Sequence, residues 1–134
     1  MVKVTAIYQG QKHCQATHEP SGATLETDAP KDNQGLGEKF SPTDLVATAL
    51  GTCILTTVAI VAERDGLDIK DSTVEVEKHM TTSPRRIGQL VIRLKLPKNI
   101  DEKFRGKLKH AAEACPVSKS LHPETQIITE ISWV

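Results

Sequence analysis

The sequence predicts an α+β fold, with a mostly antiparallel sheet and one long central helix in a single domain over residues 1–134. Apolar and polar side chains alternate in several short segments, a pattern typical of strands. An uncharged run from Leu45 to Ala62 indicates one long helix. A chain of 134 residues leaves little room for a second domain. The predicted order of elements is β-β-β-α-β-β-α-β.

Three strands are predicted at the N-terminus. Residues 2–9 and 12–18 alternate and are joined by a tight turn at QGQ, and residues 23–28 form the third strand. The next stretch, APKDNQGLGEKF, is rich in glycine, proline and charged residues, which is typical of a loop.

The long helix is predicted to run from residue 42 to about residue 64. Ser41 suits the N-cap, Pro42 suits the first helical position, and Asp44 follows the cap by one helical turn. Gly66 can adopt the left-handed conformation that ends a helix. A small domain has few places to bury an apolar helix of about 35 Å. We therefore expect a second subunit to cover part of it.

The C-terminal half is predicted to hold a hairpin, a helix and a closing strand. Residues 72–81 and 88–96 alternate and are joined by TSPRRI. Apolar residues at helical spacing indicate a helix from about 101 to 114, which Pro116 ends. The segment CPVSKSLHPE reads as a short turn or half-helix, and TQIITEISWV as the last strand.

Composition excludes several classes of partner. Lys+Arg and Asp+Glu are both 17, and few residues are aromatic, so we expect no nucleic-acid surface. The start MVKVTAIYQG lacks the features of a signal peptide, which predicts a cytoplasmic protein. The uncharged run contains several hydroxyl residues and is flanked by Asp44 and Glu63, which argues against a membrane span.

The three cysteines are the main candidates for chemistry. Cys14, Cys53 and Cys115 are odd in number and widely spaced, so they do not form a secreted disulfide framework. Cys53, inside the apolar helix, either fills space as a small hydrophobe or acts as a reactive thiolate. If Pro116 opens a new short helix, Cys115 is its N-cap, where free N–H groups would stabilise a thiolate, whereas the C-terminal end of the preceding helix would oppose it. Disulfides in a reducing cytosol are usually catalytic or redox-sensing.

The histidines show no metal-ligand spacing, so we expect no metal site and no cofactor. One alternative stays open, a zinc site assembled by the fold from Cys53, Cys115 and a histidine. His122 follows CPVSKSL closely and could contact Cys115.

Two motifs together carry a family resemblance. SPTDLVATALGTC, followed far downstream by CPVSKSL, resembles the OsmC/Ohr family of osmotically inducible and organic hydroperoxide resistance proteins. GEKFSP and SPRRIGQLVIRLKLP are also similar to that family. The resemblance points to a divergent OsmC-like branch. It implies an intertwined homodimer with the long helix in the dimer core and active sites at the interface.

The resemblance also implies an activity. Members of the family are peroxiredoxin-like thiol peroxidases that reduce organic hydroperoxides, and hydrogen peroxide more weakly, in oxidative-stress defence. Cys53 matches the peroxidatic cysteine and Cys115 the resolving cysteine. A dithiol or a lipoyl protein would restore the reduced state. We expect no nucleic-acid partner and no membrane partner.

The family activates its peroxidatic cysteine with an arginine that a glutamate holds. The matching glutamate position is Thr43, followed by the acidic Asp44. The first hairpin has no arginine, so the candidate cations are Lys12, His13, Arg85 and Arg86. We take Asp44 and Arg86, with Cys53 and Cys115, as the predicted catalytic residues.

Two other functions stay open at this point. One is a non-enzymatic dimer that binds a small apolar ligand at the interface, motivated by the departure from the family's Arg–Glu pair. The other is a redox-sensing or metal-holding module.

Overall fold

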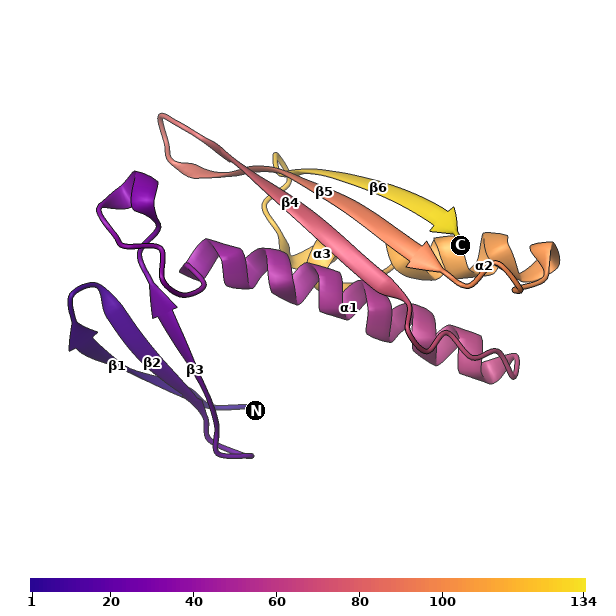
Figure 1. The fold of residues 1–134 in the computed structure, drawn as a ribbon, viewed down its shortest axis with the longest axis horizontal. Helices are drawn as coiled ribbons and strands as arrows, with labels where there is room; N and C mark the ends of the chain where they lie inside the picture. Colours follow the sequence, from indigo (N-terminus) through magenta and orange to yellow (C-terminus); the bar gives the residue numbers. More distant parts are fainter. The chain divides into compact units, whose positions relative to one another are not determined.

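The computed structural model describes all 134 residues as an α+β protein with two three-stranded sheets (Figure 1). The chain divides into two compact units, Met1–Val46 and Ala47–Val134, and we describe each by itself. The predicted α+β class and order of elements are confirmed. The strand pairs are antiparallel except for one, but the strands form two sheets rather than one.

The N-terminal unit holds an antiparallel sheet in the order β1-β2-β3, whose strands are Val4–Gly10, His13–His18 and Ala23–Asp28. Gln11 and Lys12, with φ of 53° and 63°, form the turn between β1 and β2. Left-handed residues at both central turn positions match the twist of the paired strands. The loop after β3 includes a short 3-10 helix, Lys31–Asn33, and returns beside the strand, because the Asp28 N–H donates to the Phe40 carbonyl over 3.1 Å.

The long helix α1 spans Pro42–Arg64, as predicted. Its start is a reciprocal cap: the Asp44 N–H donates to Ser41 Oγ (3.0 Å) and the Ser41 N–H donates to Asp44 Oδ2 (2.9 Å). It ends where Gly66 takes φ of 69° and the Leu67 N–H donates to the Ala62 carbonyl. This is the left-handed ending expected from the sequence.

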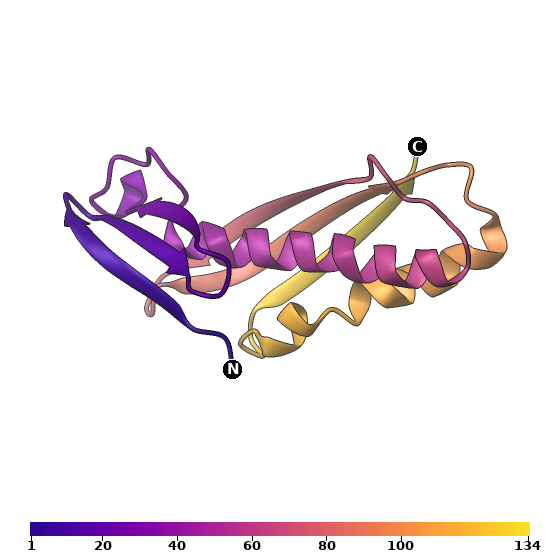
Figure 2. The ribbon, with the colours of Figure 1, turned by 90° about the horizontal axis from the view of Figure 1, so that it is seen from below.

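The C-terminal unit holds the second sheet, in the order β4-β5-β6, with helices on one of its faces (Figures 1 and 2). Strands β5 and β6 are parallel because the chain between them crosses over through two helices. The remaining elements are β4 Thr73–Thr81, β5 Arg86–Leu96, α2 Glu102–Glu113, α3 Pro116–Ser120 and β6 Gln126–Trp133.

The core of this unit lies between the sheet and helices α1 and α2. Every second residue of β5 faces the helices, and helix residues three or four apart face the sheet. The fully buried side chains of these two sets are Leu90, Ile92, Leu94 and Leu96 on β5, and Leu50, Ile54, Val58 and Ala62 on α1.

Helix α1 buries only one of its faces. It is long and apolar enough to cross a membrane by length and composition alone, with a mean hydropathy of 2.2, and 33% of that apolar window is buried. A core helix of a soluble protein passes the same test. Thr52, Thr56 and Ile60 are exposed on the helix. That a second subunit covers this face stays a prediction.

Candidate thiol site

The C-terminal unit brings Cys53 and Cys115 into the same part of its core, where each affects the pKa of the other, although they lie far apart in the sequence. Cys53 lies in the middle of α1, and Cys115 is the N-cap of α3. Both are free thiols. Cys53 is half-buried and Cys115 is fully buried, so only the first residue is open to solvent.

The position of Cys115 follows from the proline after it. Helix α2 ends at Glu113, and Pro116 would remove a hydrogen bond from a helix that continued. Proline is well suited to the first position of a new helix, so α3 begins there and Cys115 becomes its N-cap. Of the two forms predicted for this segment, a short turn or a half-helix, the structure has a short helix, Pro116–Ser120.

Backbone N–H groups at the start of α3 point at the two sulfurs. The first N–H groups of any helix lack partners within the helix. Here the Val117 N–H favours the thiolate form of both cysteines and the Ser118 N–H that of Cys115, which lowers the pKa in each case. The Cys115 side chain accepts no capping hydrogen bond. These donors favour negative charge on sulfur.

Cys53 is the thiol that ionises more readily. Burial alone would raise its pKa, because desolvation disfavours the thiolate. Hydrogen bonds from the Cys115 thiol, the Val117 N–H and the Thr57 hydroxyl outweigh burial and lower the pKa of Cys53. Thr57 is one helical turn further along α1, with its Oγ1 3.9 Å from Cys53 Sγ.

Cys115 shows the opposite behaviour. Burial raises its pKa, and its hydrogen bond to Cys53 raises the pKa further because the thiolate of Cys53 holds the proton on Cys115. Of the two thiols, Cys53 therefore loses its proton first, while Cys115 keeps its own. Since the thiolate is the nucleophile, Cys53 is the sulfur that can attack an electrophile, with a second thiol already in contact.

The predicted cation Arg86 makes its contacts elsewhere. Its Nη2 lies 3.2 Å from Glu124 Oε2, and its Nη1 donates to the Ile87 carbonyl over 3.2 Å. No cation contributes to the lowered pKa of Cys53. Asp44 forms the cap of α1 with Ser41 in the N-terminal unit. Catalytic roles for Asp44 and Arg86 stay predictions.

The other candidate residues occupy different surroundings. His13 lies 3.6 Å from Asp28 and 3.5 Å from Glu38, within the N-terminal unit. Lys12 lies in the β1–β2 turn, and Arg85 is exposed in the β4–β5 turn. Two further residues considered from the sequence are Cys14 and His122. Cys14 is half-buried on β2, and His122 Nδ1 accepts from the Glu124 N–H over 3.1 Å.

Sequence reasoning missed the donors to the thiolate. Thr57 had a usable signal, because a residue four positions after Cys53 shares its helix face. The N–H of Val117 could be suspected only from the proposed helix start at Pro116, and its reach to Cys53 depends on how the helices pack.

Comparison with known proteins identifies the family. The OsmC-like protein family model matches residues 35–130. The chain belongs to the OsmC-like protein family. The resemblance inferred from the two cysteine motifs is thereby confirmed.

Individual OsmC-like relatives match nearly the whole chain. The crystal structure of a "putative osmotic stress induced and detoxification response protein" from Psychrobacter arcticus 273-4 is 40% identical, with a TM-score of 0.93 over 98% of this chain and 96% of that one. "Uncharacterized protein YmaD" of Bacillus subtilis (strain 168) is 27% identical over 135 residues, 95% of this chain and 90% of YmaD. The organic hydroperoxide resistance protein OhrB of Bacillus subtilis shares the fold, with a TM-score of 0.69, 24% identity and 98% of each chain covered.

Proposed function

We propose that this protein is a cysteine-based thiol peroxidase that reduces organic hydroperoxides, and hydrogen peroxide more weakly, in oxidative-stress defence. The observation that carries the proposal is the placement of the half-buried Cys53 of α1 against the core cluster that contains the fully buried Cys115 at the start of α3. The pKa values of the two thiols shift in opposite directions, which agrees with different roles. Membership of the OsmC-like family supports it, since hydroperoxide resistance proteins such as OhrB share the fold.

The first step is attack by Cys53 on the peroxide. The thiolate sulfur takes the terminal oxygen of the hydroperoxide, and the O–O bond breaks. The alkoxide takes up a proton and leaves as an alcohol, while Cys53 becomes a sulfenic acid. Cys53 suits this step because its pKa is lowered and its sulfur is only half-buried.

The second step is resolution by Cys115. Its sulfur attacks the sulfur of the Cys53 sulfenic acid, gives up its proton, and displaces hydroxide, which leaves as water. The product is a Cys53–Cys115 disulfide. Two thiols and one hydroperoxide have then become one disulfide, one alcohol and one water. A dithiol or a lipoyl protein would reduce the disulfide by exchange.

The burial of Cys115 supports this order of events. A fully buried thiol with a raised pKa is a poor first nucleophile, because little thiolate forms and substrate cannot reach it. It is still well placed to meet a sulfenic acid on Cys53, with which it shares a hydrogen bond. The roles of the two cysteines are therefore not interchangeable.

Assembly as a homodimer is part of the proposal. The exposed face of α1 carries no charged side chain between residues 45 and 62, and it includes Ala49 and Ile60 beside hydroxyl residues. A second copy would remove this face from water. Two further residues would then complete each site at the interface. One is Asp44, and the other is a cation, either Arg86 or one of Lys12, His13 and Arg85. We expect the dimer in the cytoplasm.

Steady-state turnover with single-cysteine variants tests the proposal. Cumene hydroperoxide consumption is measured with a dithiol reductant for the wild type, Cys53→Ser, Cys115→Ser and Cys14→Ser. The first variant should lose activity, the second should consume about one peroxide per chain and then stall or over-oxidise, and Cys14→Ser should match the wild type. Full activity in Cys53→Ser would refute the mechanism.

One observation favours a second candidate, a dimer that binds a small apolar ligand without turnover. No cation contributes to the lowered pKa of Cys53, whereas the family's peroxidases use an arginine there. This function predicts a slow, non-saturating reaction of Cys53 with peroxides. Saturation kinetics with cumene hydroperoxide would exclude it.

A further inference from the structure

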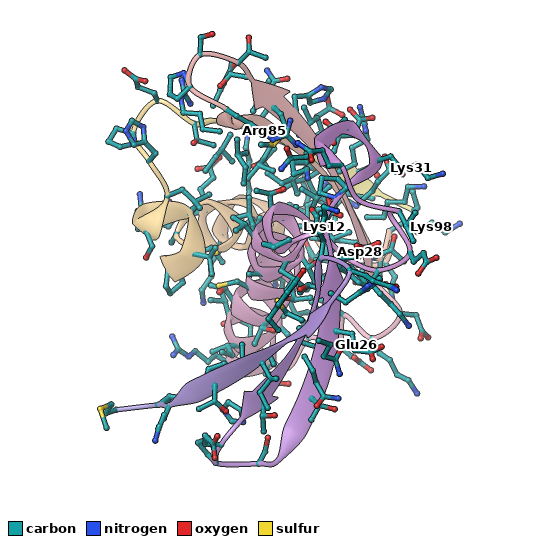
Figure 3. All side chains as sticks on the ribbon, turned by 90° about the vertical axis from the view of Figure 1, so that its left-hand side faces the viewer. Lys12, Glu26, Asp28, Lys31, Arg85 and Lys98 are labelled. Carbon is teal, nitrogen blue, oxygen red and sulfur yellow. The ribbon has the colours of Figure 1, made fainter.

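A second group of chemically active side chains lies in the N-terminal unit, apart from the thiols. His13 begins β2, Asp28 ends β3, and Glu38 is in the loop that follows. His13 and Asp28 are directly paired across the two strands. One ligand-capable atom from each of the three residues lies within 4.8 Å of the other two. Figure 3 shows Asp28 at the end of β3, near Lys12 of the β1–β2 turn, with Glu26 further along the strand.

Asp28 holds an oxygen that lacks a partner in a buried position. Its side chain is 0% exposed, and its Oδ1 has no hydrogen-bond partner. The other oxygen, Oδ2, accepts from the Glu38 N–H over 3.0 Å, which is the main reason that the pKa of Asp28 lies below its usual range despite burial. An unsatisfied buried carboxylate oxygen is costly, because it has lost its water without gaining a partner. A cation that binds Oδ1 as well as Oδ2 would remove that cost.

The distances within the group fit metal coordination better than hydrogen bonding. His13 Nε2 lies 3.6 Å from Asp28 Oδ2 and 3.5 Å from Glu38 Oε2. A hydrogen bond from a ring N–H to a carboxylate would span about 2.7–3.2 Å. Ligands about 2.1 Å from a tetrahedral zinc ion are separated by about 3.4 Å, close to both distances.

We propose that His13, Asp28 and Glu38 bind a divalent first-row transition metal ion, with zinc as the preferred ion. One imidazole and two carboxylates are a ligand set that zinc accepts, with water in the remaining position. The half-buried His13 and the exposed Glu38 leave an entry path, while the buried Asp28 anchors the ion. The Glu38 N–H donates to Oδ2 and so holds the Asp28 carboxylate in place, as outer contacts do in metal sites.

Such an ion would join three parts of the N-terminal unit. It would link β2, the end of β3 and the loop 29–40, which leads into α1 at Pro42. The site contains none of the cysteines, so its occupancy can be read from metal absorption without a peroxidase assay.

Cobalt(II) is the probe for the test, because its visible absorption reports the ligand type. Chelator-treated, full-length wild type is titrated with cobalt and then with zinc, by calorimetry and absorption. We expect one cobalt per chain, d–d bands without thiolate-to-cobalt charge transfer, and displacement by zinc. Glu38→Gln and His13→Gln should each weaken binding by at least about tenfold, since each removes a ligand.

Two matched variants serve as controls. His18→Gln changes a histidine at the other end of β2 that contacts Ser21, and Glu26→Gln changes a carboxylate on β3 that pairs with Lys39. Both should bind cobalt like the wild type. Glu38 is exposed, so Glu38→Gln keeps the test independent of folding. Unchanged affinity in Glu38→Gln and His13→Gln, no binding to the wild type, or a thiolate charge-transfer band lost in Cys53→Ser would overturn the proposal.

Discussion

Replacing Cys115 by alanine should raise the pKa of Cys53, because it removes one of the three donors to the thiolate. The Val117 N–H and the Thr57 hydroxyl would remain. A hydrogen bond to a charged group contributes about 1.5–3 kcal/mol, and a weak S–H donor to a half-buried sulfur belongs at the lower end. Since one pKa unit corresponds to about 1.4 kcal/mol, we expect a rise of about one unit.

The assay is the pH dependence of alkylation at Cys53. Iodoacetamide reacts with the thiolate, so its rate rises with pH through the pKa. In a Cys14→Ser background, the alanine variant's profile should shift to higher pH, with about tenfold slower alkylation below both pKa values. Cys115→Ser keeps a hydroxyl donor and should shift the profile less. A Cys53 pKa in Cys115→Ala at or below that of the parent would refute the reasoning.

Three further predictions concern stability, each measured by urea unfolding. Leu94→Ala, at a fully buried position on β5, should lower the free energy of unfolding by about 2–5 kcal/mol, and a loss under about 1 kcal/mol would contradict the packing. Gly51→Ala should lower the free energy of unfolding by about 1 kcal/mol, because the new Cβ would lie 2.9 Å from Val76 Cγ2. In Gly106→Ala the new Cβ meets nothing within 4 Å, so this change should raise the free energy of unfolding by about 0.5–1 kcal/mol. Equal effects at the two glycines would contradict this. Ser41→Ala should cost about 1 kcal/mol by removing the cap, and no loss would contradict the cap's role.

The sequence predicted most of the fold because its local signals agree with one another. The Ser41 cap, the Gly66 ending and the Pro116 restart each depend on one or two neighbouring residues, and all three appear as expected. The division of the strands into two sheets was missed, since alternation identifies a strand without naming its partner. The parallel pairing of β5 with β6 was missed for the same reason.

The candidate site was predictable only in part. Cys53 and Cys115 followed from the family motifs. The groups that lower the pKa of Cys53 include a backbone N–H, which cannot be recognised from the type of any residue. The group of His13, Asp28 and Glu38 could not be predicted from sequence spacing, because the three residues are widely separated in the sequence. Strand pairing and the returning loop bring them together. Metal motifs in sequence depend on short, regular spacings, which a site built across strands does not have.

The central claim is that Cys53 attacks a hydroperoxide and Cys115 resolves it. Peptide mapping by mass spectrometry after one equivalent of cumene hydroperoxide, with hydrogen peroxide in parallel, tests it most directly. The account predicts rapid formation of an intramolecular Cys53–Cys115 disulfide, faster with the organic peroxide, with Cys14 left free. Both thiols remaining reduced for minutes, or oxidation of Cys53 with Cys115 still free, would contradict it.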